Sequence, residues 1–247
     1  MSEAAFVEYD GASVHTSSAR PILDRLTLSV AEGEVLALIG RSGSGKTTAL
    51  RLVNALICPT AGVVRVAGRA TTDWDAISLR RRTGYVIQEI GLMPHLTVAA
   101  NAGIVAELEG WDAARREARV TELLDLVGLP AAQYGARYPH ELSGGQRQRV
   151  GVARALAVDP PLMLLDEPFG ALDPITRREL QDGFRALQRQ LRKTAIFVTH
   201  DLREAARVAD RWALLADGRL LAAGTPAELE ASTDAAVRAF LAAGRDE

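Results

Sequence analysis

The stretch 40-GRSGSGKTT-48 constrains the fold of this chain more than any other segment. The apolar run Val35–Ile39 precedes it and predicts a buried strand, and residues 45–56 follow it and predict a helix. Residues 40–47 fit the pattern G-x-x-x-x-G-K-[ST]. This pattern requires a strand before it and a helix after it, and the sequence predicts both.

The chemistry of this loop suits a phosphate group. Glycines let backbone N–H groups converge on phosphate oxygens, and the helix N-terminus adds a positive partial charge. Lys46 is expected to reach the β- and γ-phosphates of a nucleotide, and the Thr47 hydroxyl to ligate Mg²⁺. The alternative, a plain glycine turn, is disfavoured by the flanking strand and helix. The expected phosphate-binding residues are Gly40, Arg41, Ser42, Gly43, Ser44, Gly45, Lys46, Thr47 and Thr48.

Short apolar runs alternate with longer helical patterns along the chain, which predicts an α/β protein with a largely parallel sheet. A mostly helical stretch at residues 97–157 interrupts the strands and contains an amphipathic helix at 111–129. The tail from Gly224 begins with Thr225 and Pro226, a cap followed by proline, and predicts one short helix. Strands are expected at residues 4–9, 26–30, 35–39, 63–66, 84–87, 162–165, 194–199, 212–216 and 220–223.

The composition argues against several classes of protein. The chain has 247 residues, a formal charge of −2 and 48% apolar residues, which is ordinary for a globular protein. This near-neutral balance gives no reason to expect a nucleic-acid binder, which usually has a basic face. Cys58 is the only cysteine and fits a reducing compartment. Apolar runs are shorter than the ~20 residues of a membrane span, and the first ten residues lack signal-peptide features. We therefore expect a cytoplasmic chain that reaches any membrane through a partner.

Polar residues end three of the predicted strands. Asp166 and Glu167 follow a buried run, where Asp166 is expected to hold the Mg²⁺ shell and Glu167 to polarise the attacking water as general base. The alternative is a solvated pair that caps the next turn. His200 follows another core strand, at the end where α/β sheets bind ligands, and is a candidate contact for the γ-phosphate. Gln88 ends a third strand and is a candidate to touch the metal or the water.

A second glycine-rich helix start lies at residues 142–150, LSGGQRQRV. Ser143, Gly144, Gly145 and Gln146 fit the capping-box pattern S-x-x-Q, which alone predicts a helix start. Each glycine costs about 1 kcal/mol relative to alanine inside a helix, which suggests that something approaches the backbone closely. A helix N-terminus with a serine hydroxyl and bare amides suits a phosphate. This site is expected to complete the nucleotide pocket of a second copy in a head-to-tail dimer.

Together these motifs resemble the ATP-binding cassette (ABC) ATPases over nearly the whole chain. LSGGQ at 142–146 is specific to that family, and LLDEP at 164–168, GALD at 170–173, Gln88 and His200 follow in the family's order and approximate spacing. The resemblance implies an α/β P-loop NTPase (RecA-like) core at about 1–89 and 158–223, with an N-terminal antiparallel β subdomain. It further implies an inserted α-helical subdomain at about 90–157 and a short helical tail at 224–247.

The resemblance also implies how the residues would work. ATP with Mg²⁺ would lie between the phosphate loop of one copy and residues 143–146 of the other, and Asp173 would link the two sites. The segment after Gln88 would face a transmembrane subunit. Family members stack an aromatic residue on adenine, but residues 12–21 contain no aromatic side chain beyond His15, and Tyr9 belongs to the first strand.

One compact cassette with a short tail looks like the ATPase subunit of a bacterial importer, peripheral on the cytoplasmic side of the cell membrane. Its partners would be permease subunits and, indirectly, a substrate-binding protein. The segments 84–104 and 163–180 resemble the ATPases of osmoprotectant importers for quaternary amines such as glycine betaine, choline and carnitine, although Thr83 and Met93 replace the expected Ile and Phe. No regulatory domain is expected after the cassette. The alternatives are an importer of an amino acid, sulfonate or polyamine, and a soluble ABC ATPase that remodels nucleic acid or protein.

Overall fold

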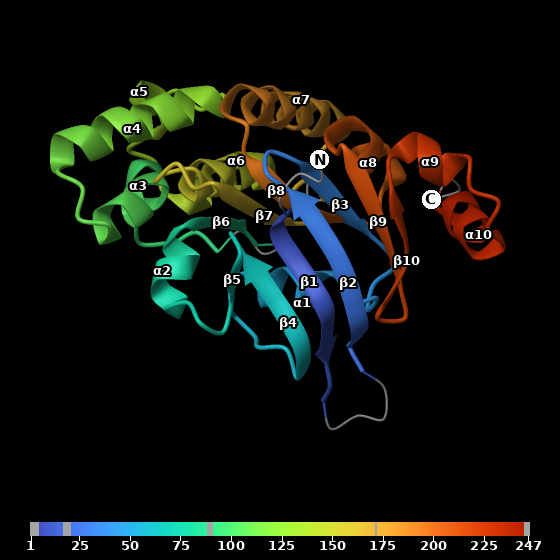
Figure 1. Cartoon of the computed structure of the whole chain (residues 1–247). Helices are drawn as coiled ribbons and strands as arrows, with labels where there is room; N and C mark the ends of the chain where they lie inside the picture. Colours follow the sequence, from blue (N-terminus) through green and yellow to red (C-terminus); the bar gives the residue numbers. More distant parts are fainter. Residues whose placement is uncertain (1–4, 17–20, 88–90, 171, 245–247) are drawn as a thin grey trace. The chain divides into compact units, whose positions relative to one another are not determined.

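The computed structural model describes residues 5–16, 21–87, 91–170 and 172–244, and Figure 1 labels its helices and strands. The chain forms two compact units. The first combines residues 1–80 with 188–247, and the second consists of residues 81–187. Within the described ranges, no helix is both long enough and apolar enough to cross a membrane.

The first unit contains an antiparallel sheet with the strand order β2-β1-β4-β5. Figure 1 shows β1, β2 and β4 side by side. The first strand continues five residues beyond the expected end at Tyr9, because a register shift around Gly11 keeps it paired with both neighbours. Gly11 has a φ of +59°, a backbone conformation that glycine adopts without steric cost. The four strands are β1 (Ala5–Val14), β2 (Leu23–Ala31), β4 (Ala61–Val66) and β5 (Arg69–Ala70).

The first unit also contains parallel strands that lead to the candidate site. Strand β3 pairs in parallel with β8 on one side and β9 on the other, and β10 pairs antiparallel with β9. All residues of β3 and β8 are buried, as expected where a parallel sheet is covered on both faces. Because Ile39 pairs with Thr199, the two strands end at the same edge. These strands are β3 (Val35–Ile39), β8 (Thr194–Thr199), β9 (Arg211–Ala216) and β10 (Arg219–Gly224).

The tail forms two helices, so the expectation of one short helix was wrong. Thr225 starts α9 (Pro226–Glu230) with a capping box completed by Glu228. A second cap follows at Asp234, whose carboxylate accepts the N–H groups of Ala236 and Val237 and starts α10 (Ala235–Ala243). An aspartate that precedes an apolar helical run is a recognised start signal. The other helices of this unit are α1 (Lys46–Val53) and α8 (Leu202–Val208), and α2 (Ala76–Arg81) ends at the boundary.

The second unit is mainly helical. Its two strands, β6 (Thr83–Val86) and β7 (Leu162–Asp166), run parallel, with Val86 opposite Leu165. Helices α3, α4 and α6 pack on one another, and α4 contributes the buried side chains of Val120, Leu123 and Leu124. The finer domain boundaries stay a prediction. The helices are α3 (Val98–Leu108), α4 (Ala113–Leu126), α5 (Ala131–Tyr134), a 3-10 turn (Pro139–Glu141), α6 (Gly144–Ala155) and most of α7 (Pro174–Leu191).

Tyr9 fastens the antiparallel sheet to the helix that follows the phosphate loop. The side chain is fully buried, and its hydroxyl donates a 3.0 Å hydrogen bond to the carbonyl of Ala49 in α1. Burial raises the pKa of the Tyr9 phenol far above its ordinary value, so the hydroxyl stays protonated and remains a donor. A ring enclosed in this way has no face to offer a nucleotide base. The structure therefore supports the exclusion of Tyr9 as an adenine contact.

We expect Tyr9→Phe to lower the free energy of unfolding by about 1–2 kcal/mol, because it removes one buried hydrogen bond and changes little else. Urea unfolding followed by circular dichroism measures the change. Tyr138→Phe is the control, since Tyr138 is exposed and its substitution should alter stability by less than about 0.5 kcal/mol. Equal effects of the two substitutions would show that the bond to Ala49 contributes nothing.

Candidate functional site

The phosphate loop joins the buried strand β3 to the start of α1. Gly43 and Gly45 have φ values of +80° and +99°, in the region that strongly favours glycine. Gly45 occupies the N-cap position of α1 and makes no side-chain capping bond. The first amide groups of α1 therefore have no capping side chain, which suits them to bind an anion.

The glycines of this loop are required by the atoms around them. A Cβ atom at Gly40 would lie 2.4 Å from Ser44 Oγ and 2.5 Å from the carbonyl oxygen of Leu215. A Cβ atom at Gly45 would lie 2.7 Å from Leu23 Cδ2 and 2.8 Å from a backbone oxygen of the same segment. Real Cβ atoms do not approach other atoms so closely. The neighbouring strands thus hold the loop tightly from two sides.

Two polar side chains inside the loop fit a ligand with several oxygen atoms. The ammonium group of Lys46 is buried and donates to the carbonyls of Gly40 at 2.6 Å and Arg41 at 2.9 Å, so it lies along the loop. The Ser44 hydroxyl is buried and has no hydrogen-bond partner among the atoms that the structure describes. A buried hydroxyl without a partner costs about 1–3 kcal/mol, and a phosphate oxygen would supply one.

A cavity of about 590 Å³ adjoins the phosphate loop. Residues 39–44 form one wall, and the exposed His200 lies at the same cavity because β8 ends beside β3. Ala236 and Phe240 of α10 also line the cavity. The volume is typical of a small-molecule site. The structure therefore brings together the loop and His200, as the sequence predicted, and adds a wall from the tail helix that the sequence did not indicate.

The two candidate carboxylates belong to the second compact unit. Asp166 is buried at the end of β7, and Glu167 follows it half-buried. Glu167 has a φ of +47°, a conformation that is uncommon for a residue other than glycine and costs on the order of 1–3 kcal/mol. Six other non-glycine residues in the described part of the chain also have a positive φ, so this conformation does not by itself single out Glu167. Gln88, the third candidate at a strand end, lies outside the described residues.

The second glycine-rich helix start has the predicted cap. Ser143 Oγ accepts the N–H of Gln146 at 3.2 Å, and the Gln146 side chain accepts the N–H of Ser143 at 2.9 Å. Gly145 has a packing role that the sequence analysis missed, because a Cβ atom there would lie 3.0 Å from Leu172 and 3.3 Å from Thr176. The sequence predicted a close approach to these glycines, and at Gly145 two side chains of the chain itself supply one. The phosphate role of residues 143–146 stays a prediction.

Asp173 caps helix α7 beside this contact. Its carboxylate accepts the backbone N–H groups of Ile175 and Thr176, each at 3.1 Å. Hydrogen bonds from the Thr176 side chain and backbone lower the pKa of Asp173, so its charge persists to more acidic pH. The same Thr176 lies against Gly145. The start of α6 and the start of α7 are thereby packed together within the second unit.

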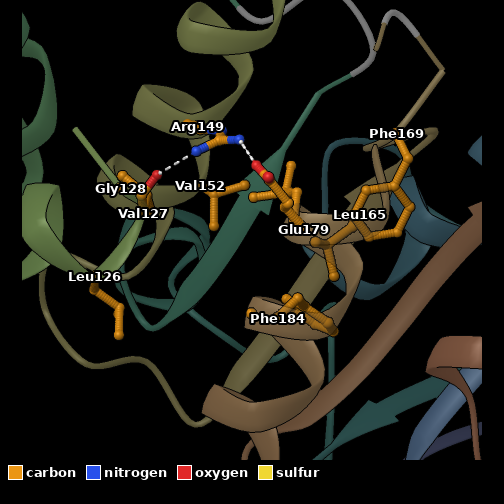
Figure 2. Close-up of a pocket in the computed structure, with 11 residues that line it drawn as sticks. Leu126, Val127, Gly128, Arg149, Val152, Leu165, Phe169, Glu179 and Phe184 are labelled. Atoms are coloured by element: carbon orange, nitrogen blue, oxygen red, sulfur yellow. Dashed lines mark hydrogen bonds and ion pairs between the residues drawn. The ribbon is translucent and has the colours of Figure 1, made fainter. Parts of the chain in front are cut away.

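A smaller cavity of about 210 Å³ lies among α4, α6 and α7 (Figure 2). Its lining is mostly apolar and includes Phe169 and Phe184. Arg149 of α6 crosses its edge, donating to the carbonyl of Val127 at 3.3 Å and to the carboxylate of Glu179 at 3.0 Å. None of the predicted site residues that the structure describes lines this cavity. Arg149 connects three helices here, and its two partners account for its position.

The strand–loop–helix geometry around Lys46 defines a P-loop nucleotide-binding protein with an α/β fold. A solved dimeric structure of a bacterial ABC transporter cassette matches 89% of this chain and 98% of its own, with 32% identity and a TM-score of 0.81. A cassette dimer in a post-hydrolysis state bound to ADP and Pi matches with 31% identity and the same TM-score. The family profile described as ABC transporter matches residues 23–170. The chain belongs to the ABC transporter family, with the P-loop NTPase (RecA-like) fold of its ATPase cassettes.

Curated relatives also match most of this chain. The osmoprotectant import ATP-binding protein of Salmonella typhimurium is 49% identical over 84% of this chain and 54% of its own length. Two Bacillus subtilis proteins, a choline transport ATP-binding protein and a glycine betaine/carnitine/choline transport ATP-binding protein, are each 50% identical over the same shares. The chain thus spans about half the length of these relatives.

We expect Gly40→Ala and Gly183→Ala to have opposite effects on stability. A methyl group at Gly40 would clash with the Leu215 carbonyl and Ser44, which should cost about 1–3 kcal/mol. Gly183 lies within helix α7 with open space beside it, so alanine there should stabilise by about 0.5–1 kcal/mol. Thermal unfolding of both variants measures the difference. A neutral Gly40→Ala would contradict the tight packing of the loop.

Proposed function

We propose that the chain binds ATP and hydrolyses it as the ATPase subunit of an ABC importer. The observation that carries the proposal is the phosphate loop between β3 and α1, with Lys46 lying along it and His200 at the same cavity. Membership of the ABC transporter family and the likeness to a cassette bound to ADP and Pi support it. The loop amides and Lys46 would hold the phosphates, and His200 would contact the γ-phosphate.

Mg²⁺ is the metal that this proposal requires. The Thr47 hydroxyl in the first turn of α1 and the buried Asp166 carboxylate are oxygen ligands of the kind Mg²⁺ prefers, and Gln88 would join them. When bound, the ion would neutralise charge on the phosphate oxygens. Glu167 would accept a proton from the attacking water, whose oxygen bonds to the γ-phosphorus while the bond to the bridging oxygen breaks. The products are ADP and inorganic phosphate.

The proposed active form is a dimer. Ser143, Gly144, Gly145 and Gln146 of one copy would close the ATP site of the other, and Asp173 would link the two sites. The dimeric arrangement of the solved cassettes supports this proposal. The helix start at Gly144, where two glycines follow the Ser143 cap, is compatible with it, since a helix N-terminus favours an anion.

We expect Glu167→Gln to bind Mg-ATP, to lose about 100-fold or more of the hydrolysis rate, and to accumulate as a dimer, because only the proton acceptor is removed. Lys46→Ala should lose nucleotide binding. Single-turnover hydrolysis, binding of a fluorescent ATP analogue and size-exclusion chromatography measure these effects. Glu117→Gln is the control, since Glu117 is an exposed carboxylate on α4. Normal turnover in Lys46→Ala would overturn the assignment of the phosphate loop.

We further propose that the imported solute is an osmoprotectant of the quaternary-amine class. The support is the identity of 49–50% to proteins whose names specify osmoprotectant, choline or glycine betaine/carnitine/choline transport. The chain would work at the cytoplasmic side of the membrane, against a permease that receives solute from a binding protein. The solute itself would contact those partners and not the ATPase.

The importer proposal is tested with the chain, its co-expressed permease and its binding protein in proteoliposomes. We expect glycine betaine, choline or carnitine to stimulate ATP hydrolysis by roughly 5-fold to 150-fold, as a coupling of 1–3 kcal/mol implies. The control is the same preparation with Lys46→Ala. If only an amino acid, a sulfonate or a polyamine stimulates hydrolysis, the importer proposal stands and the proposal of a quaternary-amine solute is wrong. If the permease does not change the hydrolysis rate, the result favours an ATPase that does not take part in transport.

A further inference from the structure

Two buried polar side chains lie on either side of His200 in the chain. Thr199 is the last residue of β8 and is 1% exposed, and Glu204 lies in the first turn of α8 and is 6% exposed. We propose that Thr199 and Glu204 are positioning residues that fix the backbone on both sides of His200. The inference rests on the proposed function, because His200 acts there as the γ-phosphate contact.

A short chain of hydrogen bonds connects these groups. The Thr199 hydroxyl donates to Glu204 Oε2 at 2.7 Å in a fully buried contact. The same hydroxyl oxygen accepts the backbone N–H of Asp201 at 3.0 Å. The residue before His200 is thus bonded to the residue after it, and Glu204 orients the hydroxyl that joins them. Because both side chains are buried, water competes poorly for these bonds.

Capping of α8 does not account for Glu204. The spacing of Asp201 and Glu204 matches a capping box, in which the N3 glutamate accepts the N–H of the N-cap residue. Here the N-cap N–H goes to Thr199 instead, and Glu204 accepts from Thr199. Asp201 already caps the helix by accepting the N–H of Arg203 at 2.7 Å. A buried carboxylate is costly unless it is hydrogen-bonded, and the Thr199 hydroxyl supplies such a bond to Glu204.

These bonds lie on either side of His200 in the chain. Its side chain is exposed at the cavity beside the phosphate loop, so the position of the imidazole depends on the backbone that carries it. Thr199 pairs across the sheet with Ile39, the residue directly before the loop. Locking the backbone at residues 199–201 therefore sets the imidazole relative to the loop. A displacement of about 1 Å at a reacting group is enough to lower a rate by as much as 100-fold.

The chain offers a matched control at the other end of the same strand. Thr194 is also 1% exposed, and its hydroxyl oxygen accepts the N–H of Gly33 at 2.9 Å. Thr194→Val and Thr199→Val each remove one buried hydroxyl from β8. Both substitutions should reduce stability, so any effect found only for Thr199→Val reflects its place beside His200.

The experiment measures ATP hydrolysis, ATP binding and stability for Thr199→Val, Thr199→Ser, Glu204→Gln, Glu204→Met and Thr194→Val in the full chain. We expect Thr199→Val and Glu204→Met to lower kcat about 10-fold to 100-fold with KM nearly unchanged. Thr199→Ser and Glu204→Gln keep an oxygen at the required place and should retain most of kcat. Thr194→Val should keep the wild-type kcat. Equal kcat values for Thr199→Val and Thr194→Val would overturn the proposal.

A second measurement needs no turnover. The chain has only 4 histidines, so the imidazole NMR signal of His200 can be assigned by its loss in His200→Gln. We expect this signal to shift in Thr199→Val and Glu204→Met and to stay in place in Thr194→Val. An unchanged signal in all three would overturn the positioning role. Absence of ATP hydrolysis in the wild type would instead overturn the proposed function. The NMR result would still show whether Thr199 and Glu204 fix the position of His200.

Discussion

The arrangement of the site in the first unit depends on one steric constraint, the contact of Gly40 with Ser44 and with Leu215 of β9. There is no room for a Cβ atom between this glycine, Ser44 and the Leu215 carbonyl. The tight contact lets β3 turn into α1 within a few residues, which places the uncapped helix start at the end of the strand. A parallel pairing with β8 then brings His200 to the same edge. The site thus follows from backbone packing before any ligand is considered.

Much of the secondary structure around the site could be predicted from the sequence, because the sequence patterns that determine it are local. A fully apolar run before a glycine-rich loop predicted β3, and a helical pattern after it predicted α1. Ser143 and Gln146, three residues apart, predicted a capping box that the structure confirms. The stretch 212–216 was expected as a strand, and β9 covers it with Trp212 buried. In each case the residues that determine the feature lie within a few positions of one another.

The features that were missed depend on contacts between distant parts of the chain. Gly145 is packed by Leu172 and Thr176, about thirty residues further along, which no local pattern reveals. Helix α10 lines the cavity of a loop nearly two hundred residues before it. Glu204 looks like an ordinary capping residue in the sequence, and its bond to Thr199 is known only from the fold. Long-range packing therefore sets the surroundings of residues whose identity the sequence already suggested.

The unfavourable features of the chain are informative because of where they lie. Asp217 also has a positive φ, but it lies in the tight turn between β9 and β10 and is followed by a glycine, where such a conformation is expected. Glu167 has the same backbone conformation at the end of a buried strand, where no hairpin requires it.

Ser44 has a buried hydroxyl without a described partner, and Glu204 is a buried carboxylate. On grounds of stability alone, each of these residues would be replaced. Natural proteins commonly depart from such local stability preferences at functional sites.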